Sequence, residues 1–273
     1  MEKLIVTVAT TGHGTPLSKY PRLPIQPRDI ANEVYECYKE GASTCHIHTR
    51  TDDGEPSVDL DRFREIIDRI RDLCCDIVIN CSTGGMFDPK LRMQPVTLRP
   101  DMVSYNAGSM NFGPDVFYNP KGVLEELGRL MEEYDVKPEV EVFDSAMLYN
   151  AIRLSETGHI KQPIHFQFCL GADGGMAASP ESIMYLKNLV PEGSTWSVLG
   201  LGRHAPTMWS LGIMLGGHVR FGTEDNIYLR RGKLATRNVD FMDDIKYLAD
   251  FFGRQIATPK EAREILGLRP SAS

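Results

Sequence analysis

Two histidines placed two residues apart, His46 and His48, are the first feature of this sequence that could carry chemistry. They fall in a β-rich run, Thr44 to Thr49, in which alternate side chains point to the same face of a strand. Two neutral imidazoles aimed at one point are suited to bind a divalent transition metal, zinc in particular. The alternative is a pair of hydrogen-bonded histidines on a polar face, and the two-residue spacing alone fits both interpretations.

A second group of functional side chains lies in the segment that starts at His218. Arg220, Gly222 and Glu224 share one parity, which would direct Arg220 and Glu224 to the same side. Glu224 is then a candidate third metal ligand, which leaves a coordination position open as catalytic zinc requires. Asp225 would form an ion pair with Arg220. Without the histidines, the alternative is that Glu224 and Asp225 stabilise the N-terminus of the following helix through its dipole.

Strand alternation in Glu139-Val140-Glu141-Val142 points to a third candidate carboxylate, Glu141. If the valines face helices, Glu139 and Glu141 face the opposite side, where isolated carboxylates are rarely buried without a partner. Glu141 is therefore a candidate acid or base, or a group that supports one. A buried salt bridge is the alternative.

Hydroxyl and glycine residues suggest where anionic ligands would bind. Ser82, Thr83, Gly84 and Gly85 follow a strand, and such a segment can hold a carboxylate through backbone N–H groups. Asn106 has the corresponding inward parity on the next strand. Farther along the chain, Gly202 and Arg203 could approach a phosphate closely, although a tight turn explains the same residues.

The elements that must position these residues alternate regularly between strand and helix. Eight strands are predicted, and the catalytic candidates lie on them or just after them; the strands are Leu4 to Thr10, Thr44 to Thr49, Ile77 to Thr83, Met102 to Ala107, Pro138 to Asp144, Ile164 to Leu170, Thr195 to Gly202 and His218 to Thr223. Helical patterns separate them, and Asp88 to Arg99 is the weakest. The alternation predicts a parallel sheet, and eight units in 273 residues favour a closed (β/α)₈ TIM barrel. The whole chain, 1–273, is then one domain with a short C-terminal extension, Pro259 to Leu266.

The sequence disfavours one other architecture and one class of partner. A doubly wound sheet is weakened because no G-x-G-x-x-G follows the first strand. The net charge of −7 argues against a nucleic-acid partner. No apolar run suggests a signal peptide or membrane span, and six scattered cysteines indicate reduced, mostly buried thiols, so we expect a cytoplasmic protein.

Taken together, several motifs resemble those of the β-keto acid cleavage enzymes. They are TTG after the first strand, then GASTCHIHTR, INCSTGG, SYNAGSMNFG, EVEVFD, GLGRH and GHVRFGTEDN, which together span essentially the whole chain. The resemblance implies a zinc-dependent (β/α)₈ barrel, and it suggests a homotetramer. It also implies a transferase reaction in which a β-keto acid and acetyl-CoA give acetoacetate and a new acyl-CoA.

The resemblance also implies roles for the candidate residues. His46, His48 and Glu224 would ligate the zinc ion, and Asp225, oriented by Arg220, would be the base that removes a proton from the carbon between the two carbonyls. Glu141 matches an inward carboxylate of the family. Ser82 would position the substrate carboxylate, and Asn106 would contact the substrate.

One segment departs from the enzymes of this family that act on amino substrates. Those enzymes carry a glutamate after the first-strand TG, whereas this chain reads Thr11-Gly12-His13-Gly14-Thr15-Pro16. We therefore expect a substrate tail that is neutral or anionic rather than cationic, in contact with His13. Two other functions stay open from sequence: a zinc-dependent barrel hydrolase or aldolase that does not use coenzyme A, and a binding protein with a vestigial site.

Overall fold

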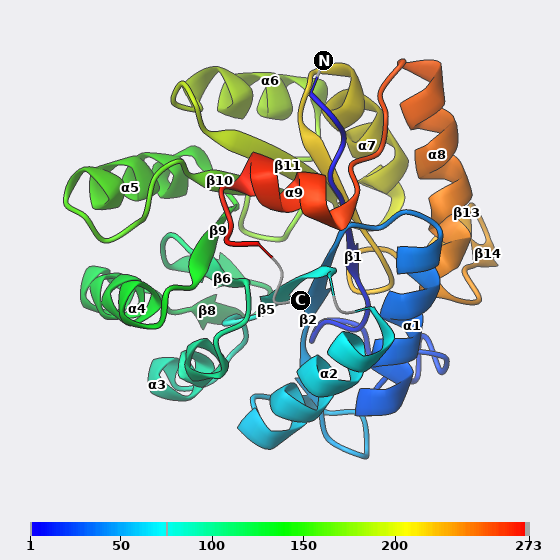
Figure 1. The fold of residues 1–273 in the computed structure, drawn as a ribbon, viewed down its shortest axis with the longest axis horizontal. Coiled ribbons are helices and arrows are strands. Elements are labelled where there is room, and N and C mark those ends of the chain that lie inside the picture. The colour runs from blue at the N-terminus through cyan, green and yellow to red at the C-terminus, as the bar shows by residue number, and fades with distance from the viewer. Residues whose placement is uncertain (1, 75, 271–273) are drawn as a thin grey trace.

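The computed structural model describes residues 2–74 and 76–270, and its eight central strands form a closed parallel barrel in the order β1-β12-β11-β10-β9-β6-β5-β2 (Figure 1). This confirms the TIM barrel. The strands are shorter than predicted by a few residues at their ends; they are β1 (Val6–Ala9), β2 (Thr44–Ile47), β5 (Val78–Cys81), β6 (Met102–Asn106), β9 (Lys137–Val142), β10 (His165–Leu170), β11 (Thr195–Gly200) and β12 (His218–Phe221).

Helices cover the outside of the barrel because one face of each is apolar. In α2, for example, Phe63, Ile66 and Ile70 recur at helical spacing and are buried. The covering helices are α1 (Pro27–Lys39), α2 (Leu60–Leu73), α4 (Lys121–Tyr134), α5 (Ser145–Glu156), α6 (Pro180–Leu189), α7 (Ala205–Met214) and α8 (Met242–Phe251). No helix in the described ranges is long and apolar enough to span a membrane.

The weakest predicted helix, Asp88 to Arg99, is broken in the structure. It forms a short α3 (Pro89–Arg92) followed by the 3₁₀ helix η1 (Gln94–Leu98). Pro95 stands at the start of η1 and has no N–H to donate to a continuing helix. Two more 3₁₀ helices, η2 (Gly202–His204) and η3 (Asn238–Phe241), precede α7 and α8.

The C-terminal segment predicted as an extension is α9 (Pro259–Leu266), which lies across one end of the barrel (Figure 1). Its Ala262 and Leu266 pack on Ile5, Val78 and Met102 from the barrel strands. Helix α9 thus closes the end at which the strands begin.

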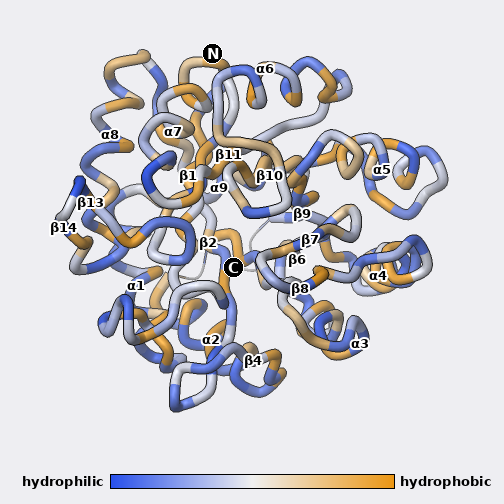
Figure 2. Tube along the Cα trace, turned by 180° about the vertical axis from the view of Figure 1, so that it is seen from behind, coloured by the Kyte–Doolittle hydropathy of each residue, from blue (hydrophilic) through white to orange (hydrophobic). Residues whose placement is uncertain are grey.

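Three hairpins that the sequence did not predict decorate the opposite end, where the strands finish. They are β3 (Thr49–Arg50) with β4 (Pro56–Ser57), β7 (Met110–Phe112) with β8 (Asp115–Phe117), and β13 (Tyr228–Arg230) with β14 (Lys233–Leu234) (Figure 2). All three lie in loops that follow barrel strands. In TIM barrels this is the end that carries the active site.

The five described cysteines are buried, as expected; they are Cys37, Cys45, Cys74, Cys81 and Cys169. Cys75 lies outside the described residues.

Candidate active site

Strand alternation directs the polar residues of β2, β9 and β12 into the barrel lumen. Val219 and Phe221 belong to the apolar core under the helices, whereas His218 and Arg220 point the other way and are also buried. The register pairs Ala9 of β1 with His46 of β2 and Thr7 of β1 with Arg220 of β12, so their side chains enter neighbouring levels of the lumen. The predicted inward parity of His46, Arg220 and Glu141 therefore agrees with the structure.

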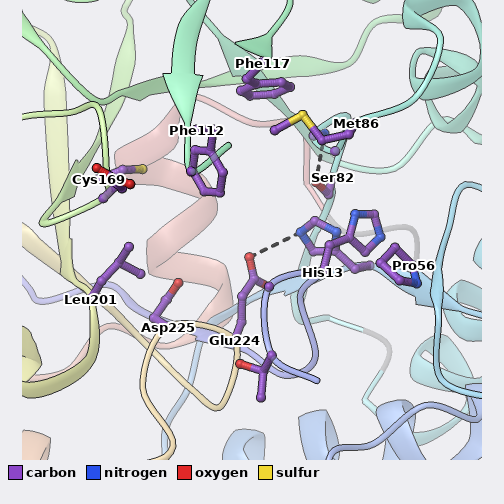
Figure 3. A pocket seen from close by; sticks show the side chains of 18 of the residues that line it. His13, Pro56, Ser82, Met86, Phe112, Phe117, Cys169, Leu201, Glu224 and Asp225 are labelled. Atoms are coloured by element: carbon purple, nitrogen blue, oxygen red, sulfur yellow. Dashed lines mark hydrogen bonds and ion pairs between the residues drawn. The ribbon is translucent and has the colours of Figure 1, made fainter. Parts of the chain in front are cut away.

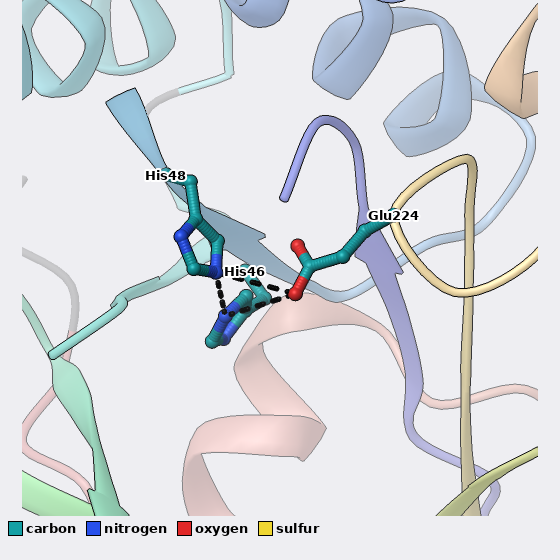
Figure 4. A group of neighbouring side chains, drawn as sticks. All are labelled: His46, His48 and Glu224. Carbon is teal, nitrogen blue, oxygen red and sulfur yellow. Dashed lines mark hydrogen bonds and ion pairs between the residues drawn. The ribbon is translucent and has the colours of Figure 1, made fainter. Parts of the chain in front are cut away.

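The two histidines and Glu224 converge on one point (Figure 4). The Nε2 atoms of His46 and His48 lie 3.2 Å apart, and Glu224 Oε1 lies 3.7 Å from the first and 3.2 Å from the second. In the tautomers that leave Nε2 unprotonated, both imidazoles direct a lone pair to this point, where Glu224 Oε1 also lies. Glu224 Oε2 and His48 Nδ1 are buried and make no hydrogen bond within the described chain.

Burial and charge favour a divalent cation at this convergence. Burial lowers the pKa of His46, and Arg220 adds to this effect, so the imidazole is neutral and able to act as a ligand. Burial alone would raise the pKa of Glu224, but His48 and Arg220 hold it well below its ordinary value. The donor set of two imidazoles and one carboxylate is the kind that holds catalytic zinc.

A second carboxylate stands behind His46. The Nδ1 atom of His46 lies 3.6 Å from Glu139 Oε2 and 3.1 Å from Asn80 Nδ2, and the Asn80 side-chain amide donates to Glu139. Burial alone would raise the pKa of Glu139, but its interaction with His46 holds it below the ordinary value. A carboxylate in this position orients an imidazole ligand. Strand alternation had placed Glu139 on the inward face without giving it a role.

Arg220 holds three carboxylates at once. Its Nε and Nη2 donate to Asp225 at 3.0 Å each, Nη2 donates to Glu224 at 2.6 Å, and Nη1 donates to Glu141 at 3.1 Å. Burial raises the pKa of Asp225 to about 6 and that of Glu141 to about 8, although Arg220 opposes both shifts. At neutral pH Asp225 is therefore mostly ionised with a pKa close to that pH, and Glu141 mostly keeps its proton.

These groups border one large cavity of about 930 Å³ at the strand ends (Figure 3). Most of the predicted site residues line it; they are His13, His48, Ser82, Gly84, Gly85, Asn106, Glu141, Gly202, Arg220, Glu224 and Asp225. His46 lies beneath His48 and does not line the cavity. Arg203 is exposed, next to the cavity-lining Gly202.

Ser82 and Asn106 present unused donors to the cavity. Ser82 Oγ accepts from Gly84 N at 3.0 Å, which leaves the hydroxyl proton available, and Asn106 Nδ2 is buried without a partner among the described residues. The hydroxyl of Thr83, in contrast, donates to the carbonyl of Ser104 at 2.6 Å, and Thr83 does not line the cavity. Thr83 therefore fixes the backbone beside Ser82 rather than presenting a group to a ligand.

The hydrogen bonds of His13 fix its tautomer. Its Nε2 lies 3.2 Å from the Thr49 carbonyl and 3.1 Å from the Ser57 carbonyl, so Nε2 is the donor. Its Nδ1 is left as an acceptor with no partner in the described ranges. Burial, together with the nearby His48, lowers the pKa of His13 to about 3, so the ring is neutral.

Two residues that support this site were not predicted. Gly12 adopts a φ of +57°, and a Cβ there would lie 2.3 Å from Glu224 Cγ. Arg50 is buried and donates to the carbonyls of Gly12, Gly54 and Thr15, which ties the loop after β1 to the β3–β4 hairpin. The TTG motif contains Gly12, but only the three-dimensional arrangement shows that Glu224 requires it.

Gly200, the last residue of β11, and Gly202, which follows the strand, have different structural roles. A Cβ on Gly200 would lie 2.6 Å from Met208 Cγ, so Gly200 is needed for packing against α7. Gly202 has open space around it and a φ of +56°, and its N–H donates to the Asp225 carbonyl at 2.8 Å. The second glycine thus links the loop after β11 to the acidic segment after β12.

Comparisons with known proteins identify similar chains along almost the whole length of this one. Residues 3–268 match the family described as beta-keto acid cleavage enzyme. The chain is 44% identical to the 3-keto-5-aminohexanoate cleavage enzyme of Fusobacterium nucleatum, over 98% of this chain and 99% of that protein. It is 35% identical to the 3-oxoadipate:acetyl-CoA acetyltransferase of Cupriavidus necator, over 97% of this chain and 94% of that protein.

Among solved structures, a binary complex of ObcA with oxaloacetate superposes with a TM-score of 0.78. The match covers 91% of this chain and 68% of that one at 20% identity, so it supports the barrel fold alone.

Proposed function

The chain belongs to the β-keto acid cleavage enzyme family, and we propose that it is a zinc-dependent enzyme that condenses a β-keto acid with acetyl-CoA. The products would be acetoacetate and a new acyl-CoA. The observation that carries this proposal is the convergence of His46, His48 and Glu224 beside the Arg220–Asp225 pair at the inner end of one cavity, which His48, Glu224, Arg220 and Asp225 line. The proposal is also supported by the names of the relatives, which include an acetyl-CoA acetyltransferase acting on a β-keto acid.

In this proposal His46, His48 and Glu224 hold the zinc ion. Three ionised carboxylates touch these ligands or Arg220, namely Glu139, Glu224 and Asp225, against the single charge of Arg220. The two negative charges left over match a divalent cation, and an uncompensated buried charge would be costly. When bound, zinc would supply Lewis-acid stabilisation of the charge that develops on the ketone oxygen.

The reaction begins with proton removal by Asp225. Asp225 would take a proton from the carbon between the ketone and the carboxylate, and Arg220 keeps both of its carboxylate oxygens in place. Ser82 and Asn106 would hold the substrate carboxylate with the donors that they leave unused, near the N–H groups of Gly84 and Gly85. Glu141, which keeps its proton, would fix the third side of the Arg220 guanidinium.

One carbon–carbon bond then forms and another breaks, and coenzyme A moves from the acetyl group to the new acyl group. The carbanion attacks the carbonyl carbon of acetyl-CoA, a carbon–carbon bond forms, and the coenzyme A thiolate leaves. The thiolate adds to the original ketone carbon, and the bond from that carbon to the former substrate methylene carbon breaks. Acetoacetate leaves after its carbanion regains the proton from Asp225, and the remaining acyl group departs as the new acyl-CoA. Gly202 and Arg203 would contact the coenzyme, which must enter beside Asp225.

Two variants test the assigned roles. His46→Ala removes a ligand and is expected to abolish both bound zinc and acetoacetate formation. Asp225→Asn leaves the three ligands intact and is expected to keep zinc while turnover falls by about 10²–10⁴-fold, as for loss of a general base. Elemental analysis of the dialysed proteins, paired with an acetoacetate assay, measures both. A zinc-free wild-type protein that turns over at full rate would overturn the metal assignment.

We also propose that the substrate tail is neutral or anionic rather than cationic. The loop after β1 carries His13 and no carboxylate between Thr11 and Pro16, and Met86, Phe112 and Phe117 give the cavity an apolar wall (Figure 3). Glu55 also lines the cavity, from the β3–β4 hairpin, and Lys19 lies on the cavity wall as well.

A panel of β-keto acids of equal length with amino, hydroxyl, carboxyl or unsubstituted tails tests this idea. We expect the amino member to have the lowest kcat/KM. A preference for the amino member that disappears in Glu55→Gln would show that Glu55 pairs with a cationic tail and would sink the idea.

The cytoplasmic location and the homotetramer stay predictions. Light scattering on the purified protein measures the second: a mass near four times 30.6 kDa is expected, and a monomer of 30.6 kDa would contradict it.

A further inference from the structure

The chain has a net charge of −7, yet the neighbouring loops after β1, β11 and β12 carry exposed cations without carboxylate partners, and one of these, Lys19, lines the cavity. Several helical cations are neutralised by an acid of their own helix, as Lys39 is by Glu36 and Arg129 by Glu133. Another set forms no ion pair within residues 2–74 and 76–270: Lys19, Arg22, Arg203, Arg231 and Lys233. We call these five residues the cationic rim. All five are exposed.

The cationic rim occupies one continuous arc of the barrel. Its members lie in the loops after β11, β12 and β1, which are neighbours in the barrel order. The loops after β12 and β1 are packed together, since Tyr20 and Leu23 contact Ile227 and the Tyr20 hydroxyl donates to the Ala235 carbonyl at 3.1 Å. The other side of the cavity presents acids instead, with Asp115 and Asp173 on its lining. A polyanion is therefore attracted to one side of the opening and repelled from the other.

The β13–β14 hairpin carries two cations of the rim, Arg231 and Lys233. Like charges on its paired strands destabilise it. Its register places Arg230 directly opposite Lys233, and like charges in that position are unfavourable. Arg230 is compensated by two contacts to Asp244 of α8, at 2.5 and 2.6 Å. Arg231 and Lys233 flank Gly232 at the turn and have no such compensation.

The same hairpin is tied rigidly to the catalytic segment. Asn226, next to Asp225, is buried; its side-chain nitrogen donates to the Tyr228 carbonyl at 2.8 Å and its oxygen accepts from Tyr228 N at 3.0 Å. Tyr228 lines the cavity and is 42% exposed. The hairpin thus runs from the cavity toward the rim of the molecule beside α8 (Figure 2).

We propose that the β13–β14 hairpin and the cationic rim form the docking site for the nucleotide part of coenzyme A. This inference rests on the proposed function, which needs acetyl-CoA beside Asp225. Arg231 and Lys233 bind the phosphates, with Lys19, Arg22 and Arg203 contributing to the same potential. The pantetheine arm then passes Tyr228 and Gly202 into the cavity. Three phosphate groups and a long uncharged arm fit an outlying cluster of cations joined to a buried site.

The test uses the double variant Arg231→Ala/Lys233→Ala in the full-length protein. We expect the KM for acetyl-CoA to rise about tenfold or more, and the rise to shrink at high salt, because exposed charges are screened. The kcat and the KM for the β-keto acid should stay unchanged. S-acetylpantetheine, which lacks the nucleotide, should be used equally well by the variant and the wild type.

A matched control removes two equally unpaired cations from the other end of the barrel. Lys187 and Lys260 form no ion pair in the described chain, and Lys187→Ala/Lys260→Ala changes the net charge by the same amount. This variant should keep the wild-type KM for acetyl-CoA. An equal rise in both double variants would reduce the effect to net charge and overturn the site.

Direct binding separates this proposal from the proposed function. Calorimetry with coenzyme A needs no turnover, and 3′,5′-ADP serves as a probe for the nucleotide alone. Weaker binding of both probes to the hairpin variant supports the docking site even if no acetoacetate is formed. Unchanged affinity for coenzyme A in that variant would overturn the docking site even in an active enzyme.

Discussion

At the scale of single residues, the site depends on a glycine as much as on its ligands. Gly12 lies against Glu224, and any side chain at position 12 would occupy the space of that carboxylate. Its positive φ adds a second constraint, since L-residues rarely adopt it. The short sequence Thr11-Gly12 is therefore part of the proposed metal site, although it holds none of the proposed ligands.

This arrangement predicts that Gly12→Ala displaces Glu224. We expect zinc affinity to fall by about 10- to 100-fold, as for residues that orient a ligand. Gly14→Ala is the matched control, because nothing lies within 4 Å of a Cβ there. Zinc titration against a chelating indicator compares the two. Equal affinities in both variants would mean that Glu224 does not hold the metal.

Sequence reasoning worked at this scale where alternation alone decides direction. The parity of His46, Glu141 and Arg220 follows from strand geometry, and the structure directs all three into the lumen. Thr83 and Gly12 show its limit. Thr83 turns its hydroxyl to Ser104, and Gly12 meets a residue more than 200 positions away. Both contacts depend on how loops pack, which spacing does not determine.

At the scale of elements, a charged cluster holds α9 across the closed end of the barrel. Arg263 of α9 donates to both oxygens of Asp101 at 2.8 and 2.9 Å, and Arg71 of α2 donates to Asp101 at 2.6 Å. Burial alone would raise the pKa of Asp101, but the hydrogen bond from Arg263 and the charge of Arg71 hold it below its ordinary value.

Breaking this cluster should destabilise the barrel. Asp101→Asn leaves Arg263 without its carboxylate, and we expect a loss of about 3 kcal/mol in the free energy of unfolding. Because the pKa of Asp101 is lowered in the folded state, its contribution is present above about pH 4 and is lost as the pH falls below that value. Urea unfolding measures both effects. Asp135→Asn, in an exposed pair with Lys161, should cost less than about 1 kcal/mol.

The elements themselves were predictable to different degrees. The strand and helix patterns alternate regularly, and Asp88 to Arg99 is the one weak helical segment, so the barrel follows from the sequence. The hairpins β7–β8 and β13–β14 were missed because they are three residues long or less and mostly exposed, so no apolar alternation marks them. They border the cavity, and much of its shape was therefore hidden from sequence.

At the scale of the whole molecule, the barrel lumen is a polar core closed by apolar layers outside it. Below the proposed metal ligands lies His165, whose Nδ1 is 2.8 Å from Thr195 Oγ1 and whose ring lies 6.2 Å from that of His218. Burial lowers the pKa of His165 to about 4. The folded protein therefore takes up this proton at a lower pH than the unfolded chain does.

Acidic pH should therefore destabilise the folded protein, because buried His165 resists protonation. As the pH falls from about 6.5 to 4, the unfolded chain binds a proton that the folded chain does not, which costs up to about 3 kcal/mol of stability. His165→Gln should flatten the pH dependence of unfolding over this interval. His159→Gln, on the loop after α5, should leave it unchanged. Identical curves for His165→Gln and the wild type would show that His165 does not titrate in this way.

The fate of one labelled carbon tests the central claim most directly. Acetyl-CoA carrying ¹³C at its acetyl carbonyl is incubated with the zinc-loaded protein and a β-keto acid, and the products are followed by NMR. The proposed bond changes place the label at the ketone carbon of acetoacetate and leave the new acyl-CoA unlabelled. Acetoacetate without the label, or cleavage of the β-keto acid at the same rate without acetyl-CoA, would contradict the account.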